Sequence, residues 1–219
     1  MIETSTECCS VALSEGAQIV AQRIDETPRR QSAMLAPYIV EVLEEAGLKA
    51  RDLDAVAVSE GPGSYTGLRV GVSTAKGICF GAGLPLIGVD TLQILACQAA
   101  TRPNRIISML DARRMEVYAA PFDAEGNKCG DTAAVILDAA SYSQELSAGS
   151  VLFIGTGVEK FQNICTHPNA AFQPCFPLAP AMLRPALTAL HKKEFKDVAY
   201  FEPFYLKEFV AGVTKHAVL

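Results

Sequence analysis

Hydrophobic and polar positions along the first part of the chain follow two different periods. Residues 9–13 and 18–24 are rich in apolar and β-branched side chains around a short glycine turn, which predicts a β-hairpin. Over residues 32–47 apolar side chains return every three or four positions, which predicts a helix. Because Pro37 lies inside this stretch and lacks a backbone donor, either the first turn is kinked or the regular helix begins near Ala36.

Strand and helix patterns continue to alternate after this helix. The expected elements are a buried strand at 53–58, a loop at 60–66, a helix at 67–82, a strand at 85–89 and a helix at 91–100. This alternation is typical of an α/β fold.

A similar but weaker pattern starts again after a break near Arg102. The expected strands lie at 105–110, 116–122, 135–137 and 151–154, with a polar helix before the last of them. A hairpin followed by alternating elements, present twice, predicts two related α/β lobes. We assign residues 1–102 to the first lobe and residues 103–219 to a smaller, more divergent second lobe.

The composition favours a globular protein that stays in the cytoplasm. The chain has 219 residues, of which 50% are hydrophobic and 20% are charged. Its apolar runs are too short to cross a bilayer, and its first residues lack the basic and apolar regions of a secretory signal. Seven cysteines are an odd number without a Cys-x-x-Cys pair, which predicts buried free thiols.

The charge pattern argues against nucleic-acid binding by this chain alone. The net charge is -5, from 19 basic and 24 acidic residues, and the basic residues never run longer than pairs. Because phosphate neutralisation supplies most non-specific affinity for nucleic acid, an RNA substrate would have to be held by another subunit.

The most specific motif is a glycine-rich loop between a predicted strand and a predicted helix. Its residues are Gly61, Pro62, Gly63, Ser64, Tyr65, Thr66, Gly67 and Arg69. Such a turn can present backbone amides to an anion, but Leu68 stands where a Walker loop follows its last glycine with lysine, and Thr66 where the dinucleotide fingerprint needs glycine. A tight strand-to-helix connection is therefore favoured over an autonomous nucleotide site.

The two helices of the first lobe carry more small and apolar residues than one core face requires. Gly67, Gly71, Ala75, Ile78 and Ala82 share a face of the second helix, so another backbone can approach it closely. Packing against the chain's own sheet or first helix and packing against another chain explain this face equally well. The apolar stripe of the first helix is likewise wider than the roughly 100° of one core face.

These motifs together resemble the TsaB (YeaZ) family of tRNA threonylcarbamoyladenosine biosynthesis proteins. The resemblance spans nearly the whole chain, is most specific in the glycine-rich loop and is looser in the second half. The matching segments, in order, are 3–6, 9–13, 61–76, 88–92, 111–118, 155–157 and 202–207.

The resemblance implies a fold and a set of partners. It implies an α/β actin-like fold, as in acetate kinase, Hsp70 and actin, with two ribonuclease H-like lobes. It also implies an accessory subunit that supports the catalytic paralogue TsaD, with the ATPase TsaE, in transferring threonylcarbamoyl to adenosine beside the tRNA anticodon. The tRNA would be bound only through the complex. No cofactor of its own is implied, although ATP or ADP at the subunit interface is left open.

In this family the first two helices contact TsaD, and the same surface can form a homodimer. The resemblance maps this surface onto Met34, Leu35, Tyr38, Ile39, Val42, Leu68, Gly71, Val72, Ala75 and Ile78. We therefore expect Gly71→Leu to weaken partner binding and to leave the monomer mostly folded.

Two departures from the catalytic paralogue predict that this chain has no activity of its own. The metal-binding His-x-x-x-His of the first helix is absent, and the scattered His167, His191 and His216 are not spaced to replace it. Glu3 stands where the usual first-strand motif has aspartate. The chain also starts close to this motif, so we expect the first strand to be incomplete or unusually short, with an unpaired sheet edge.

Two alternative functions remain, both less well supported. An actin-like phosphotransferase would need carboxylates on Mg²⁺, for which Glu3 and Asp111 are the available residues. A glycoprotease-like hydrolase would need a nucleophile, but Ser64 has no Gly-x-Ser-x-Gly setting.

Overall fold

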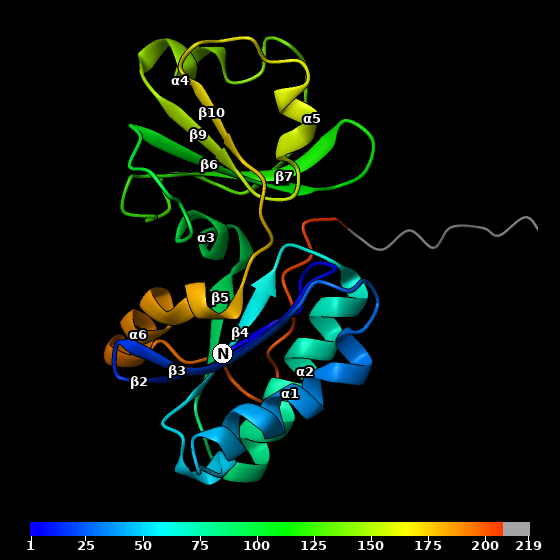
Figure 1. Cartoon of the computed structure of the whole chain (residues 1–219), viewed down its shortest axis with the longest axis vertical. Helices are drawn as coiled ribbons and strands as arrows, with labels where there is room; N and C mark the ends of the chain where they lie inside the picture. The colour runs from blue at the N-terminus through cyan, green and yellow to red at the C-terminus, as the bar shows by residue number, and fades with distance from the viewer. Residues whose placement is uncertain (208–219) are drawn as a thin grey trace, which may run out of the picture.

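Two five-stranded sheets form two lobes, which lie one above the other in Figure 1. The structure is a computed structural model and describes residues 1–207. The first lobe holds the N-terminal sheet and the second lobe holds the sheet that begins after residue 104. The prediction of two α/β lobes is therefore confirmed.

The first sheet has the order β3-β2-β1-β4-β5. β1 is antiparallel to β2 and parallel to β4, and β4 is parallel to β5. β1 has only two residues, but it lies in the centre of the sheet and pairs on both sides. The expectation of an unpaired sheet edge at the first strand is therefore wrong. The strands are β1 Ile2–Glu3, β2 Cys9–Glu15, β3 Gln18–Asp25, β4 Val56–Gly61 and β5 Leu86–Asp90.

The second sheet repeats this topology, with the order β10-β9-β6-β7-β8. β6, β7 and β8 form an antiparallel meander, and β9 and β10 add in parallel beside β6. β10 was not among the predicted strands. The strands are β6 Arg105–Asp111, β7 Glu116–Phe122, β8 Ala133–Ile136, β9 Val151–Ile154 and β10 Ala170–Gln173.

The helices differ greatly in length between the lobes. Those of the first lobe that were predicted at 32–47 and 67–82 are confirmed, whereas α3 ends before the predicted residue 100. α1 begins at Gln31 with Pro37 inside it, so the alternative of a start near Ala36 is wrong. The helices are α1 Gln31–Glu45, α2 Tyr65–Ala82, α3 Thr91–Ala96, α4 Ser143–Ala148, α5 Val158–Gln162 and α6 Leu183–Lys192, with 3-10 turns η1 Ala50–Asp52 and η2 Ala179–Met182.

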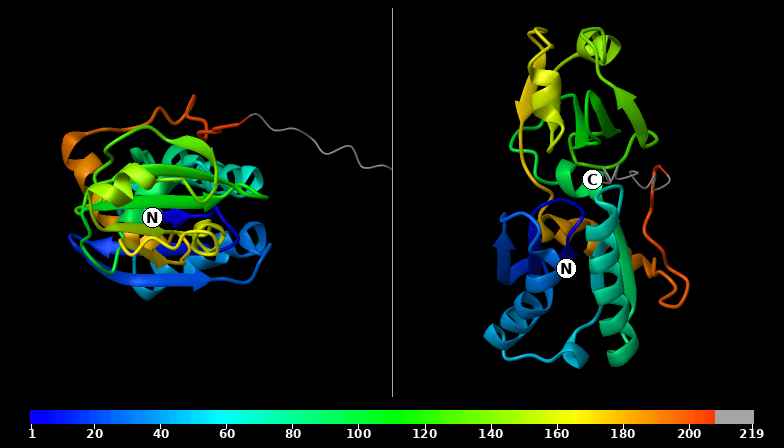
Figure 2. Two further views of the ribbon diagram at one scale, coloured as in Figure 1. Left: turned by 90° about the horizontal axis from the view of Figure 1, so that it is seen from above. Right: turned by 90° about the vertical axis from the view of Figure 1, so that its right-hand side faces the viewer.

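Helices cover both faces of the first sheet. Because successive strand residues point to opposite faces, neighbouring side chains of one strand pack on different helices. Val56 and Val58 pack in the cluster that includes residues of α1 and α2, whereas Ala57 packs with Met182 and Ala186 on the opposite face. Figure 2 shows α1 and α2 side by side on one side of this sheet. The helix pair is therefore held by the first lobe alone.

The C-terminal part of the chain leaves the second lobe and returns to the first. The Ala179 amide donates to Ser10 Oγ (2.9 Å), the Lys196 amide to the Leu86 carbonyl (2.8 Å) and the Phe204 amide to the Glu60 carbonyl (2.6 Å). The predicted division placed all residues after 102 in the second lobe. That assignment is wrong for residues 179–207, which return to the first lobe. There Met182 and Ala186 bury the outer face of the first sheet.

All seven cysteines are free, as predicted. The prediction that they are buried is confirmed only for Cys8, Cys9 and Cys79, because the other four are partly or fully exposed. Within residues 1–207, none of the helices is long and apolar enough to span a membrane.

Candidate functional site

The glycine-rich loop joins the end of β4 to the start of α2, and its glycines serve close packing. A Cβ atom on Gly63 or Gly67 would lie closer than 3.0 Å to a backbone oxygen, of Ser5 or Thr4 respectively. Gly61 has a φ of 115° and lies as closely against the Phe204 carbonyl. Only glycine permits these approaches, which explains the unusual sequence of the loop.

Several polar groups of this loop bind the chain itself. The Ser64 amide donates to the Ser5 carbonyl (2.6 Å), and Ser64 Oγ caps α2 by accepting from the Gly67 amide (3.3 Å). Thr4 Oγ1 donates to the Gly67 carbonyl (2.7 Å). The Arg69 guanidinium stacks over the Tyr65 ring at 4.1 Å from its centroid. These contacts agree with a strand-to-helix connection rather than with a phosphate cradle.

Glu3 is a structural carboxylate at the end of β1. Its side chain is fully buried and its Oε1 accepts from the Ser5 amide at 2.6 Å. Its Oε2 has no hydrogen-bond partner within the described part of the chain. Burial raises the pKa of Glu3 to about 7, against the opposing effect of the hydrogen bonds from Ser5.

Asp111, the other candidate carboxylate, is held by a lysine of the second lobe. Asp111 Oδ1 accepts from Lys160 Nζ (2.8 Å) and from the Arg113 amide (2.6 Å). The Asp111 amide in turn donates to Thr156 Oγ1 (3.1 Å). The ammonium of Lys160 is therefore paired with one oxygen of this carboxylate, Oδ1.

A cleft of about 1450 Å³ lies between the lobes and brings the two sets of motifs together. The first lobe contributes the loop after β1 and the glycine-rich loop, and the second lobe contributes the β6–β7 turn. Asp111 lines this cleft but the buried Glu3 does not, so the two carboxylates do not share one surface. Lining residues include Ser5, Thr6, Ser64, Tyr65, Arg113, Thr156, Tyr205 and Lys207.

The two histidines within residues 1–207 do not lie together. In the part of the chain that is described, no group of three or more His, Cys, Asp or Glu side chains is arranged to hold a metal ion. His167 and His191 lie in different lobes, in the loop before β10 and in α6, and His216 lies outside the described residues.

Six of the ten predicted partner-interface residues are buried inside this chain. Gly71 lies against the Thr4 hydroxyl, so the small-residue face of α2 packs on β1 and β4 rather than facing outward. The prediction of an outward-facing surface is wrong for these six, because close approach to the chain's own sheet uses the same small residues. They are Leu35, Val42, Leu68, Gly71, Val72 and Ala75.

The other four predicted residues are partly exposed at the edges of the helix pair. They are Met34, Tyr38, Ile39 and Ile78. The Tyr38 hydroxyl donates to Asp25 Oδ2 (2.9 Å), and burial of the ring together with this acceptor raises the pKa of Tyr38. Tyr38, Ile39 and Ile78 also pack against the core of the first lobe.

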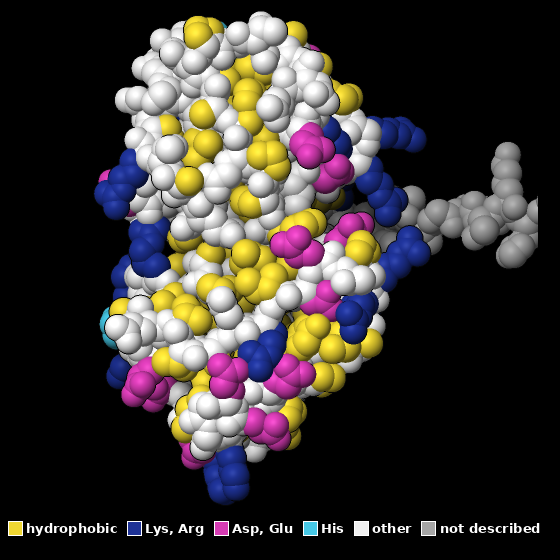
Figure 3. All heavy atoms as spheres, in the orientation of Figure 1, with side chains coloured by type: hydrophobic (Ala, Val, Ile, Leu, Met, Phe, Trp, Pro, Cys, Tyr) yellow, Lys and Arg dark blue, Asp and Glu magenta, His cyan; other side chains and the backbone are white. Residues whose placement is uncertain are grey.

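The outer face of α1 and α2 displays apolar residues that the sequence analysis missed. Phe80 is 85% exposed and Val40 is 51% exposed. Within the described chain, a Cβ on Gly77 or Gly81 would meet nothing within 4 Å. Figure 3 shows hydrophobic side chains gathered over this helix pair at the lower right. Helical geometry could have predicted this exposure. At 100° per residue, Phe80 lies about 120° around α2 from the centre of its buried stripe.

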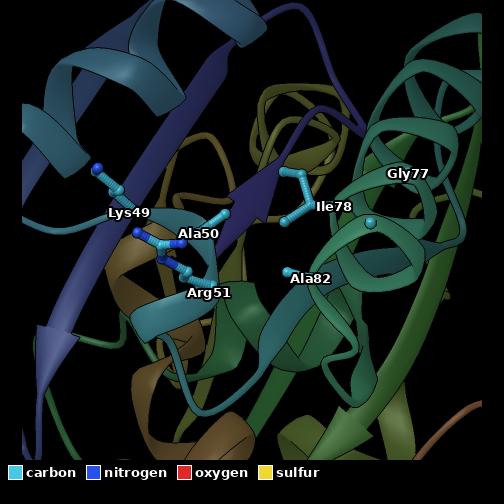
Figure 4. Close-up of a pocket in the computed structure, with 7 residues that line it drawn as sticks. Lys49, Ala50, Arg51, Gly77, Ile78 and Ala82 are labelled. Atoms are coloured by element: carbon cyan, nitrogen blue, oxygen red, sulfur yellow. The ribbon is translucent and has the colours of Figure 1, made fainter.

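A hollow of about 440 Å³ adjoins this outer face. Figure 4 shows Lys49 with Ala50 and Arg51 of η1 on one side of it and Gly77 and Ile78 of α2 on the other. Two basic side chains, those of Lys49 and Arg51, therefore lie at its rim.

A pair of lobes with one repeated topology, closing on a polar cleft, defines an actin-like protein of two ribonuclease H-like lobes. Residues 19–206 match the family model described as "TsaD: tRNA N6-adenosine threonylcarbamoyltransferase". The chain is 34% identical over 221 residues to the tRNA threonylcarbamoyladenosine biosynthesis protein TsaB of Escherichia coli, covering 96% of this chain and 94% of that protein. The chain belongs to the TsaB (YeaZ) family, a branch of these TsaD-related proteins.

Further relatives agree with this family. The TsaB protein of Haemophilus influenzae is 40% identical over 121 residues, covering 53% of this chain and 50% of that protein. The solved structure of YeaZ from Pseudomonas aeruginosa superposes with a TM-score of 0.83 at 28% identity, covering 94% of this chain and 97% of that one.

Proposed function

We propose that this protein is a non-catalytic accessory subunit of tRNA threonylcarbamoyladenosine biosynthesis that binds the catalytic paralogue TsaD. The observation that carries this proposal is the state of the two candidate carboxylates. Glu3 is fully buried and does not line the cleft, and Asp111 is paired with Lys160 at 2.8 Å. An actin-like phosphotransferase would need such groups free to hold Mg²⁺ beside a phosphate.

The proposed partner surface is the outer face of α1 and α2. Exposed aromatic and aliphatic side chains at the centre of a surface are typical anchors for a partner, and Phe80 and Val40 are of this kind. The open space over Gly77 and Gly81 allows a partner helix to approach α2 closely. We include the partly exposed Met34 and Tyr38 at the edge of this surface.

The remaining parts of the proposal concern the complex. With a net charge of -5, the chain contributes little to phosphate binding, so the tRNA is bound through the complex in the cytoplasm. TsaE would join as the ATPase, and ATP or ADP would bind at the subunit interface rather than in this chain alone. In the absence of TsaD, the same helical face would form a homodimer.

Omission of single subunits from a tRNA modification assay tests the accessory role. We expect threonylcarbamoylation to require both this protein and TsaD from the same organism, and neither alone to modify tRNA. ATP-dependent modification by this protein without TsaD would refute the non-catalytic role.

A matched pair of variants tests the surface. Phe80→Asp should weaken TsaD binding at least about tenfold, as truncation of a buried aromatic anchor commonly does. Ile136→Asp is the control, because Ile136 is also apolar and 74% exposed but lies on β8 of the second lobe. Equal affinity of the two variants for TsaD would show that the partner binds elsewhere.

A further inference from the structure

Residues 196–207, here called the strap, run along the first lobe from β5 to the cleft. The strap begins where the Lys196 amide donates to the Leu86 carbonyl (2.8 Å) and passes Glu60, whose carbonyl accepts from the Phe204 amide (2.6 Å). Between these points Lys76 Nζ of α2 donates to the carbonyls of Ala199 (3.2 Å) and Phe201 (2.9 Å). The strap is therefore fixed to the first lobe at residues 196, 199, 201 and 204.

The strap also covers the start of α2. The Phe204 carbonyl lies against Gly61, where a Cβ atom would not fit, and the rings of Tyr65 and Tyr205 lie 4.8 Å apart. Phe204 and Tyr205 therefore pack on the glycine-rich loop and the first turn of α2, in addition to the bonds that Thr4 and Ser5 make there.

The last described residue of the strap reaches the other lobe. Lys207 Nζ lies 2.6 Å from Glu116 Oε1, and Glu116 is the first residue of β7. Both residues line the cleft together with Tyr65 and Tyr205. This ion pair joins the two lobes across the mouth of the cleft.

The covalent links between the lobes lie elsewhere and are bonded to each other. Gln98 Nε2, after α3, donates to the Phe176 carbonyl (3.0 Å), and Gln173 Nε2 donates to the Gln98 carbonyl (2.9 Å). Figure 1 shows the end of the strap, in red, to the right of the region between the lobes and α3 to the left. The two linkers thus lie together on the side of α3, and the strap lies away from them, where a rotation about the linkers would move the lobes furthest apart.

We propose that the strap is a latch, in which the Lys207–Glu116 ion pair holds the cleft closed and so keeps the start of α2 ordered. The two side chains are 50% and 23% exposed, and ion pairs of this kind shift an equilibrium by about fivefold at most. The latch is therefore weak enough to open reversibly. Opening would expose the cleft and loosen residues 61–68 in the same step.

Hydrogen exchange of the isolated full chain tests the latch without any partner, so its outcome is independent of the proposed function. Lys207→Gln and Glu116→Gln should each raise exchange in peptides covering 61–68 and 202–207 by up to about fivefold. The charge swap Lys207→Glu with Glu116→Lys should restore the slow exchange. Glu194→Gln is the control, since its pair with Lys192 is 3.9 Å long, 64% exposed on both sides and away from the cleft.

Scattering and salt give two further readouts of the same opening. Small-angle X-ray scattering should show a larger radius for the Gln variants, and 1 M salt should reproduce their exchange in the wild type by screening the pair. Unchanged exchange in both Gln variants, or a charge swap that behaves like them, would overturn the latch.

Discussion

Gly71 of α2 provides a direct test of how the helix pair is packed. The sequence alone suggested that Gly71→Leu would disturb a partner and spare the monomer. In the structure Gly71 is buried, and an added Cβ would lie 3.5 Å from Val58 Cγ2 and much closer to Thr4 Oγ1. We therefore expect even Gly71→Ala to destabilise the monomer, and Gly71→Leu to do so severely.

The size of the effect follows from three contributions. Alanine gains about 1 kcal/mol of helix propensity over glycine. Against this, displacing the buried Thr4 hydroxyl breaks its 2.7 Å bond to the Gly67 carbonyl, which loses about 1 kcal/mol. Overpacking against β1 adds about 1–3 kcal/mol. The free energy of unfolding should consequently fall by about 1–3 kcal/mol.

Gly77→Ala on the same helix is the matched control. Nothing in the described chain lies within 4 Å of its added Cβ, so this variant should gain stability, by up to about 1 kcal/mol. Urea unfolding of both variants, followed by circular dichroism, measures the difference in sign. If Gly71→Ala stabilises the protein as much as Gly77→Ala does, α2 does not pack on Thr4 and the argument fails.

Two other predictions concern ionisable groups in the core. Because folding raises the Glu3 pKa from 4.5 to about 7, the wild-type free energy of unfolding should fall by up to about 3 kcal/mol as the pH rises through this window. Urea midpoints of Glu3→Gln should lack that fall, and an identical pH profile would contradict the burial of an ionisable Glu3. A thiol reagent should label Cys129 first, whereas Cys8 and Cys79, buried and with pKa values raised to about 12 and 11, should react only on unfolding. Early labelling of Cys8, followed by mass spectrometry, would show that β2 is not in the core.

Local patterns were sufficient to predict the long elements of the first lobe. The hairpin of β2 and β3 and both long helices follow from hydrophobic period and glycine position, which act over a few residues. The same information could not decide which way the glycine face of α2 points, because an internal sheet and a partner helix both select small residues at Gly67 and Gly71. Only the position of Thr4, more than sixty residues away in sequence, shows that this face packs on the internal sheet.

The features that the sequence did not predict all depend on distant contacts. α6 has apolar residues at helical spacing, but its packing of Ala186 against a sheet formed by residues before 91 depends on distant contacts. The strap has no regular secondary structure, and Lys207 contacts a residue 91 positions earlier in the chain. The burial of Glu3 and the pairing of Asp111 with Lys160 likewise require the three-dimensional fold, although both residues were identified as the carboxylates to examine.

The two lobes share one strand topology but differ in the helices that follow equivalent strands. α1 and α2 have 15 and 18 residues, whereas α4 and α5 at the corresponding positions have 6 and 5. At 1.5 Å per residue, the first pair offers about 22 and 27 Å of helix for a partner to pack along, and the second pair offers less than about 10 Å. Helix packing with a structurally related partner is thus available on the first lobe only. The second lobe instead contributes the hairpin that holds Asp111 and pairs with Lys207, and this hairpin lines the cleft. Because the strap connects the hairpin to α2, a change in the cleft can reach α2 through the strap.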